Sequence, residues 1–106
     1  MAWLALFVAG IFEVVWAFAM KQSVGFNRPL PSAIMIVTMI FSFGLLAYSM
    51  RSLPLGTAYT IWTGIGAVGA FLAGIAWLGE PVTFTRVLAA VLIVSGLVLM
   101  KAATPA

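Results

Sequence analysis

Glu13 is the side chain whose type and position most strongly indicate chemistry. It is the only charged residue among the first twenty, and it stands in the apolar segment Gly-Ile-Phe-Glu-Val-Val-Trp at residues 10–16. In a membrane-spanning helix an acidic residue costs about 2.5 kcal/mol or more, so it is normally kept where it faces a partner, a cavity or a substrate path. Glu13 is therefore predicted to mark a functional site. The alternative is a permanently protonated Glu that bonds a neighbouring helix for packing alone.

The helical neighbours of Glu13 are small or aromatic. Gly10, Glu13 and Ala17 share one face of a helix, and Trp16 lies beside them. Small residues let a second helix approach closely. The carboxylate is thus expected to point in the direction of that second helix.

A second segment brings aromatic groups to one helical stripe. Tyr59, Trp62 and Gly66 recur at positions i, i+3 and i+7, which places a phenol and an indole on the same face. Aromatic residues in membrane helices often act as interfacial anchors, and this is what we expect of Trp3 and Trp77. Trp62 lies several residues inside its segment, which favours a role in a pocket.

Three hydroxyl side chains form a polar stripe between these two segments. Thr38, Ser42 and Ser49 lie at i, i+4 and i+11 on an otherwise apolar helix. They could face a ligand. Alternatively, Thr38 and Ser49 could bond the carbonyl groups of their own helix.

A carboxylate surrounded by Trp, Tyr and hydroxyl groups suits a small cation. The anion supplies charge, ring faces add cation–π attraction, and phenol or hydroxyl oxygens accept hydrogen bonds. Desolvation and a second copy of the same carboxylate both oppose ionisation, so protons and cations would compete for the site. If only a loaded site changes sides of the membrane readily, a proton gradient would drive cation export.

Composition places the chain in a bilayer. Of its 106 residues, 65% are hydrophobic and only 7% are charged, and the mean hydropathy is +1.25. Soluble proteins average about a quarter charged residues. We expect one all-α membrane domain over residues 1–106. The five Lys and Arg residues are scattered singly, which argues against nucleic acid as a partner.

The residue inventory excludes several kinds of site. The chain has no Cys and no His, which removes disulfides, thiolate sites and the commonest metal ligand. It also lacks a nucleotide-binding loop and a nucleophile–base pair, so we expect no enzymatic activity, no metal and no cofactor. Any proton chemistry is left to the two acids, Glu13 and Glu80.

Four apolar segments are long enough to cross a membrane, at residues 3–20, 30–50, 57–78 and 83–100. At about 1.5 Å per residue, roughly twenty residues cross a hydrocarbon core of about 30 Å. The fourth segment spans the membrane only if Arg86 extends its charge to the interface. Glu80 and Pro81 are expected at the start of this last helix, where an acid meets the positive helix end and Pro fits the first turn.

The loop charges are nearly balanced between the two sides of the membrane. Four spans place Arg51 and Lys101 on one side, and Lys21, Arg28 and Arg86 on the other. Because Lys and Arg asymmetry sets orientation, neither direction of insertion is strongly specified. An antiparallel pair of oppositely inserted copies is therefore allowed, and it would surround a midplane site with inverted repeats.

The motifs resemble those of the small multidrug resistance transporters, and more closely their guanidinium exporter subtype. The resemblance rests on Gly-Ile-Phe-Glu-Val-Val-Trp-Ala at residues 10–17, Pro-Leu-Gly-Thr-Ala-Tyr-Thr-Ile-Trp-Thr-Gly-Ile-Gly at residues 54–66, Glu80-Pro81 and Gly96. It runs essentially end to end. It implies an antiparallel, dual-topology homodimer in the bacterial inner membrane that exchanges cations for protons.

The resemblance also implies roles for individual positions. Glu13 would be the carboxylate shared by protons and substrate, and Gly10 would pack close to it. The substrate site would be lined by Trp16, Ser42, Tyr59 and Trp62; the bend of the third span would lie at Gly64 and Gly66; and the dimer contact would include Leu92, Ile93 and Gly96. Ala89 departs from the pattern, because a Gly is common there among relatives.

The choice of substrate separates the remaining interpretations. Guanidinium is planar and donates hydrogen bonds around its edge, so its site should offer acceptors such as Ser42, Tyr59 and paired Glu13 carboxylates. Quaternary ammonium drugs donate none and require mainly aromatic surface. We expect guanidinium and small guanidinyl cations as substrates. The alternatives are a quaternary ammonium exporter of the same family, a passive cation channel, and a nonenzymatic assembly subunit in which Glu13 only joins helices.

Overall fold

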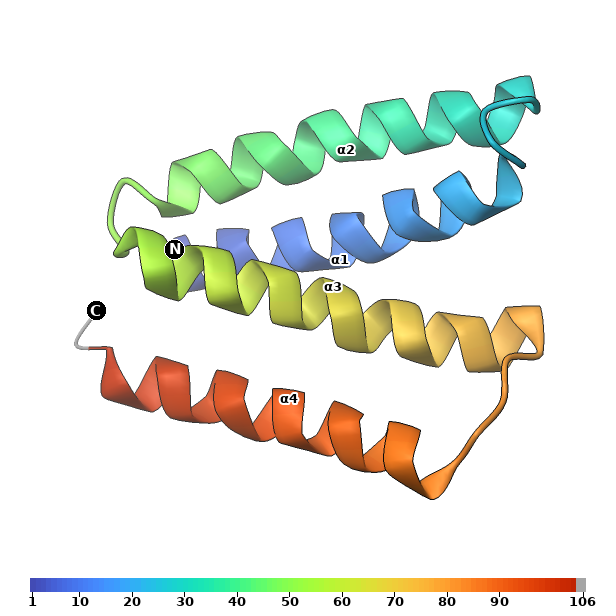
Figure 1. The fold of residues 1–106 in the computed structure, drawn as a ribbon. Coiled ribbons are helices and arrows are strands. Elements are labelled where there is room, and N and C mark those ends of the chain that lie inside the picture. Colours follow the sequence, from blue (N-terminus) through green and yellow to red (C-terminus); the bar gives the residue numbers. More distant parts are fainter. Residues whose placement is uncertain (105–106) are drawn as a thin grey trace.

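The computed structural model describes residues 1–104, which form four helices in an up-and-down order (Figure 1). Residues 105 and 106, which belong to the expected 1–106 domain, lie outside this range. Each helix is long and apolar enough to cross a membrane, and the described residues include no strand. The all-α membrane class is therefore confirmed. The helices are α1 (Ala2–Gln22), α2 (Pro29–Ser49), α3 (Leu55–Leu78) and α4 (Phe84–Ala103).

Local sequence accounts for where these helices start and stop. Pro29 occupies the first position of α2, where its missing N–H and fixed φ fit a helix start. Gly79 ends α3 in the left-handed region at φ 67°, a conformation that a side chain would disfavour. Thr83 caps α4, because its hydroxyl oxygen accepts a hydrogen bond from the Arg86 N–H at 3.2 Å.

The start of α4 corrects one expectation. Glu80 and Pro81 do not belong to the first turn of that helix, which begins at Phe84 and holds no acidic residue. Instead, the backbone N–H of Glu80 bonds the Gly74 carbonyl at 3.1 Å, which ties the connection back to α3. The helix starts after the capping residue Thr83 and not at Pro81, although Pro often occupies the first turn of a helix. Residues 79–83 therefore form a non-helical connection.

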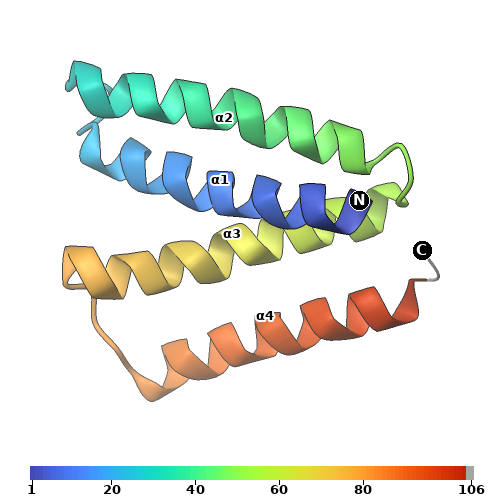
Figure 2. The same ribbon diagram turned by 180° about the vertical axis from the view of Figure 1, so that it is seen from behind.

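The helices lie side by side in the order α2, α1, α3, α4 (Figures 1 and 2). Helix α1 packs against both α2 and α3, whereas the backbone of α4 lies beside α3 alone. Helix α1 is therefore central to the fold, and the segment that carries Glu13 has neighbours on two sides.

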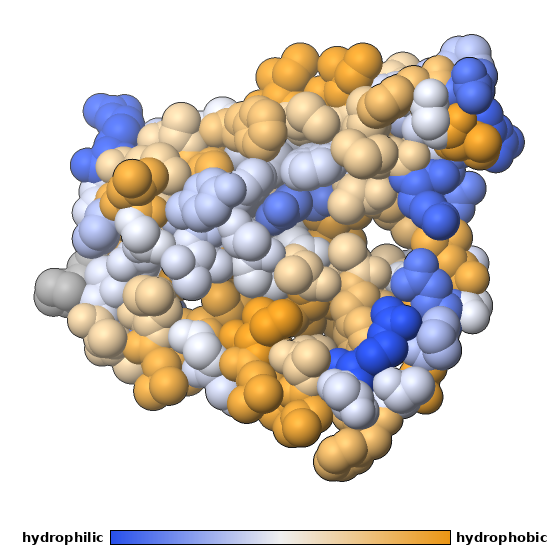
Figure 3. Space-filling view, viewed as in Figure 1, coloured by the Kyte–Doolittle hydropathy of each residue, from blue (hydrophilic) through white to orange (hydrophobic). Residues whose placement is uncertain are grey.

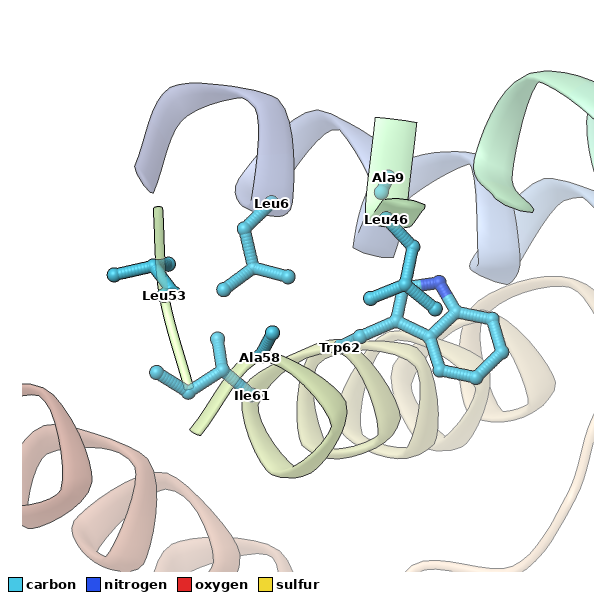
Figure 4. Packing of buried hydrophobic residues seen from close by; sticks show 7 residues of the cluster. All are labelled: Leu6, Ala9, Leu46, Leu53, Ala58, Ile61 and Trp62. Atoms are coloured by element: carbon cyan, nitrogen blue, oxygen red, sulfur yellow. The ribbon is translucent and has the colours of Figure 1, made fainter. Parts of the chain in front are cut away.

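The core lies where α1, α2 and α3 meet. Figure 4 shows the Trp62 ring reaching from α3 toward Ala9 of α1 and Leu46 of α2. Glycines allow α1 and α3 to approach closely, because a Cβ at Gly69 would overlap the Val14 side chain. The buried apolar cluster comprises Leu6, Ala9, Leu46, Leu53, Ala58, Ile61 and Trp62.

Helix α4 has no buried residue within the described chain. Figure 3 shows hydrophobic residues over α2 and α4, a paler band of intermediate residues between them, and the strongly hydrophilic residues mainly at the ends of the helices. Arg86 lies in the first turn of α4, with its guanidinium 5.4 Å from the centre of the Phe71 ring. A largely apolar helix with no buried residue needs lipid or a partner around it.

We predict that Gly69→Ala destabilises the protein because its new methyl group must displace Val14, a β-branched side chain with few alternative rotamers in a helix. Overpacking of this kind costs about 1–3 kcal/mol, more than the roughly 1 kcal/mol gained in helix propensity. The matched control is Gly44→Ala, where an added Cβ meets no atom within 4 Å. Thermal unfolding in detergent should show a lower midpoint for Gly69→Ala alone; equal midpoints would contradict the packing argument.

Candidate functional site

Glu13 lies on α1 with its carboxylate directly against Gly66 of α3. A Cβ on Gly66 would overlap the carboxyl group, so only a glycine leaves room for it. One carboxylate oxygen, Oε1, is buried and has no hydrogen-bond partner among the described residues. A buried polar atom without a partner is costly, which is why it is a marker of a site that awaits a proton, an ion or a ligand.

A hydrogen-bonded chain connects all three packed helices next to this site. The Trp62 indole N–H donates to Ser42 Oγ at 2.9 Å, and Ser42 donates in turn to the Ala9 carbonyl at 2.7 Å. Ser42 is fully buried. Its single proton is therefore committed to α1, and its main effect is to hold the Trp62 ring in place.

Aromatic rings continue from Trp62 in two directions. Tyr59 lies 5.6 Å from Trp62 between ring centroids, and Phe43 lies 5.7 Å from it on the other side. Trp16 meets Phe43 edge-to-face at 6.4 Å. The four rings thus form one continuous aromatic series, in the order Trp16, Phe43, Trp62 and Tyr59.

The Trp16 indole supplies a second unpartnered polar atom. Its Nε1 is buried and has no hydrogen-bond acceptor among residues 1–104. Trp16 is one helical turn from Glu13 on α1, so the orphan donor and the orphan carboxylate oxygen come from neighbouring side chains. The pair offers one acceptor and one donor to whatever occupies the site.

The sequence pattern identified most of these residues but missed two. Phe43 was not predicted, although it directly follows Ser42 and could have been considered as an aromatic neighbour of that hydroxyl. The Ala9 carbonyl also escaped prediction, because a backbone acceptor leaves no signal in residue type. The own-helix alternative is confirmed for two hydroxyls, since Thr38 bonds the Ile34 carbonyl and Ser49 bonds the Leu46 carbonyl, each at 2.7 Å.

Three of the glycines singled out in the sequence, Gly10, Gly64 and Gly66, each face a different neighbour. A Cβ at Gly10 would meet the Ile65 side chain, and one at Gly64 would meet Leu97 of α4. Gly66 receives the Glu13 carboxylate instead. Helix α3 continues without a break through this segment, so the expected bend remains a prediction while the close contacts are explained.

The residues expected at the dimer contact lie together on one surface. Leu92, Ile93 and Gly96 are exposed, and with Tyr59 they line a groove of about 550 Å³ between α3 and α4. Glu13 does not line this groove. One chain thus leaves Tyr59, Phe43 and the α4 surface exposed.

Glu80 lies in a different environment from Glu13. It shares a recess of about 300 Å³ with Lys21 and Arg86, and its Oε1 is 3.9 Å from the Arg86 guanidinium. Both side chains are more than a third exposed, so this ion pair contributes little to stability. Within residues 1–104 no group of three or more His, Cys, Asp or Glu side chains could hold a metal ion.

Comparison with known proteins places this arrangement in a family. A family model described as Small Multidrug Resistance protein matches residues 1–101. A guanidinium exporter of Yersinia pseudotuberculosis serotype I (strain IP32953) is 51% identical over 104 residues, covering 98% of this chain and 100% of that relative. Guanidinium exporters of Salmonella typhimurium and Escherichia coli (strain K12) are each 50% identical over 104 residues, covering 98% of this chain and 99% of theirs. The chain therefore belongs to the Small Multidrug Resistance family and is a multi-pass transporter of the bacterial inner membrane, not an enzyme.

Proposed function

We propose that this transporter exports guanidinium and small guanidinyl cations in exchange for protons, by alternating access around Glu13. The observation that carries the proposal is the buried Oε1 of Glu13, which has no hydrogen-bond partner among residues 1–104. An acid in a membrane helix is expensive unless something neutralises or pairs it. A proton or a bound cation fulfils that requirement, and only one of them can do so at a time.

Competition for one carboxylate provides the coupling. When Glu13 is charged and empty, movement of the site through the apolar barrier is costly, because the charge has no partner among the described side chains. A proton or a cation removes most of that cost. The loaded forms therefore change sides readily, and protons entering down their gradient drive cations outward.

The site chemistry and the relatives together favour guanidinium. Proteins about half identical over nearly the whole chain are named guanidinium exporters. Guanidinium needs a planar arrangement of acceptors and a ring face, which the Glu13 carboxylate, the exposed Tyr59 and the anchored Trp62 can offer. Ser42 contributes indirectly, since its proton is already bonded to α1.

A second, oppositely inserted copy would complete the site. Helix α4 has no buried residue, and the groove that holds Tyr59, Leu92, Ile93 and Gly96 is open. The loop cations, two on one side and three on the other, allow both orientations. In an antiparallel homodimer the partner's carboxylate would add a second anion to the site, with α4 forming the contact between copies.

We predict that Glu13→Gln abolishes guanidinium accumulation, because the neutral amide cannot exchange a proton for a cation. Uptake of labelled guanidinium into proteoliposomes with an acidic interior should fall to the level of protein-free vesicles. Glu80→Gln is the matched control; it removes the other acid, which pairs with Arg86 outside the site, and should keep uptake within about twofold of native.

Three outcomes would contradict this assignment. If Glu13→Gln transported as well as the native protein, Glu13 would not be the coupling group. If Glu80→Gln alone abolished exchange, the roles of the two acids would be reversed. Accumulation of tetrapropylammonium without accumulation of guanidinium would identify a quaternary ammonium exporter instead.

We also predict that Ser42→Ala weakens guanidinium binding by releasing Trp62. The indole N–H would lose its acceptor at a buried position, which costs about 1–3 kcal/mol and loosens the ring. The apparent KM for guanidinium should rise by on the order of tenfold. Ser49→Ala is the control, because Ser49 is equally buried on the same helix but bonds only its own backbone. An equal KM change in both variants would show a general packing defect.

A further inference from the structure

An apolar groove with a basic mouth lies on α1, α2 and α3, and Glu13, Trp16 and Trp62 do not line it. Its volume is about 520 Å³. We call it the outer groove. Its lining consists of Val14, Val15, Phe18, Ala19 and Gln22 from α1, Arg28, Leu30, Pro31 and Ile34 at the start of α2, and Ala73 and Trp77 from α3.

Polar and apolar groups are separated along the outer groove. Gln22 is the last residue of α1, and Arg28 directly precedes α2, so the polar mouth lies at the end of the bundle where the first loop runs (Figure 1). Below Gln22 the α1 lining residues Ala19, Phe18, Val15 and Val14 are apolar, and residues 22 to 14 span about 12 Å at about 1.5 Å per residue. One leaflet of a hydrocarbon core is about 15 Å deep. The groove thus matches the depth of a single acyl chain.

The walls of the groove are suited to an alkyl chain. Phe18 and Trp77 meet edge-to-face with ring centroids 6.1 Å apart and form one side. The small residues Ala19 and Ala73, both buried, form part of the lining and leave the groove hollow. Trp77 is 74% exposed, so the mouth carries an aromatic ring at the depth where membrane proteins place interfacial anchors.

The positive charge of Arg28 at the mouth of the outer groove favours a lipid with an anionic headgroup. Arg28 is exposed at the mouth with the Gln22 amide, and neither Glu13 nor Glu80 lines the groove. A guanidinium binds phosphate oxygens through two parallel N–H donors, and the amide supplies a further donor. Basic pockets between membrane helices recognise anionic headgroups in this way. A zwitterionic lipid would bring a second cation next to Arg28 and gain less.

We propose that the outer groove binds one anionic phospholipid per chain, with an acyl chain between Phe18, Trp77 and Ile34 and the phosphate at Arg28 and Gln22. The inference goes beyond the proposed transport function and does not depend on it. Its readout is lipid binding, so loss of transport activity would leave the test valid.

The test is native mass spectrometry of the purified protein released from mixed micelles of dioleoyl-phosphatidylglycerol and dioleoyl-phosphatidylcholine. The native chain should retain about one phosphatidylglycerol and prefer it by on the order of tenfold, the effect of one charge-assisted pair. Arg28→Gln should abolish this preference. Arg51→Gln, which removes an exposed arginine at the opposite end of the bundle, should preserve it. Equal losses in both variants would show general electrostatic attraction and overturn the site.

A second pair of variants tests the groove itself. Val15→Trp fills the outer groove from a partly exposed position without touching Arg28, and it should reduce retained phosphatidylglycerol to the level of phosphatidylcholine. Ile11→Trp, one turn earlier on an exposed part of α1, is the size-matched control and should bind as the native chain does. Normal binding by Val15→Trp would overturn the proposal. So would displacement of the lipid by glycerol phosphate, which carries the anion without the chain.

Discussion

The fold depends on accommodating one carboxylate inside an apolar helix. Glu13 fits between α1 and α3 because Gly66 has no side chain, and Gly10 and Gly69 let the same two helices approach on either side of it. These glycines supply the space for the carboxyl group, but they supply no hydrogen-bond partner for its Oε1. The acid keeps an unpaired oxygen, so the packing that tolerates it also leaves it ready to bind.

Precise placement of the aromatic wall comes from hydrogen bonding, because lipid gives helices no hydrophobic reason to adopt one particular arrangement. The bonds from Trp62 to Ser42 and from Ser42 to the Ala9 carbonyl join three helices through two side chains. Because Phe43 and Tyr59 pack against the Trp62 ring, its fixed position also restricts where these two rings lie. Rigid placement of this kind lowers the entropy lost when a planar cation binds.

Much of this could be predicted from the sequence, because a bilayer makes residue type unusually informative. Hydropathy identified four spans, and the isolation of Glu13 indicated the site before any geometry was known. Phe43 and the Ala9 carbonyl could not be predicted, since their roles depend on how α1, α2 and α3 cross. The span expected from residue 83 agrees with the observed start of α4, but Glu80 and Pro81 lie before its first turn, because the hydroxyl of Thr83 caps the helix.

The loose attachment of α4 has a consequence for biogenesis. Its backbone lies beside α3 only, and an extended connection at residues 79–83 separates the two helices. The contacts among α1, α2 and α3 therefore do not involve α4, so these three helices can pack together before α4 takes its place. Among the described residues, only α3 and a few side chains cover α4, and most of its surface stays exposed. Lipid or another protein must therefore cover the rest of α4.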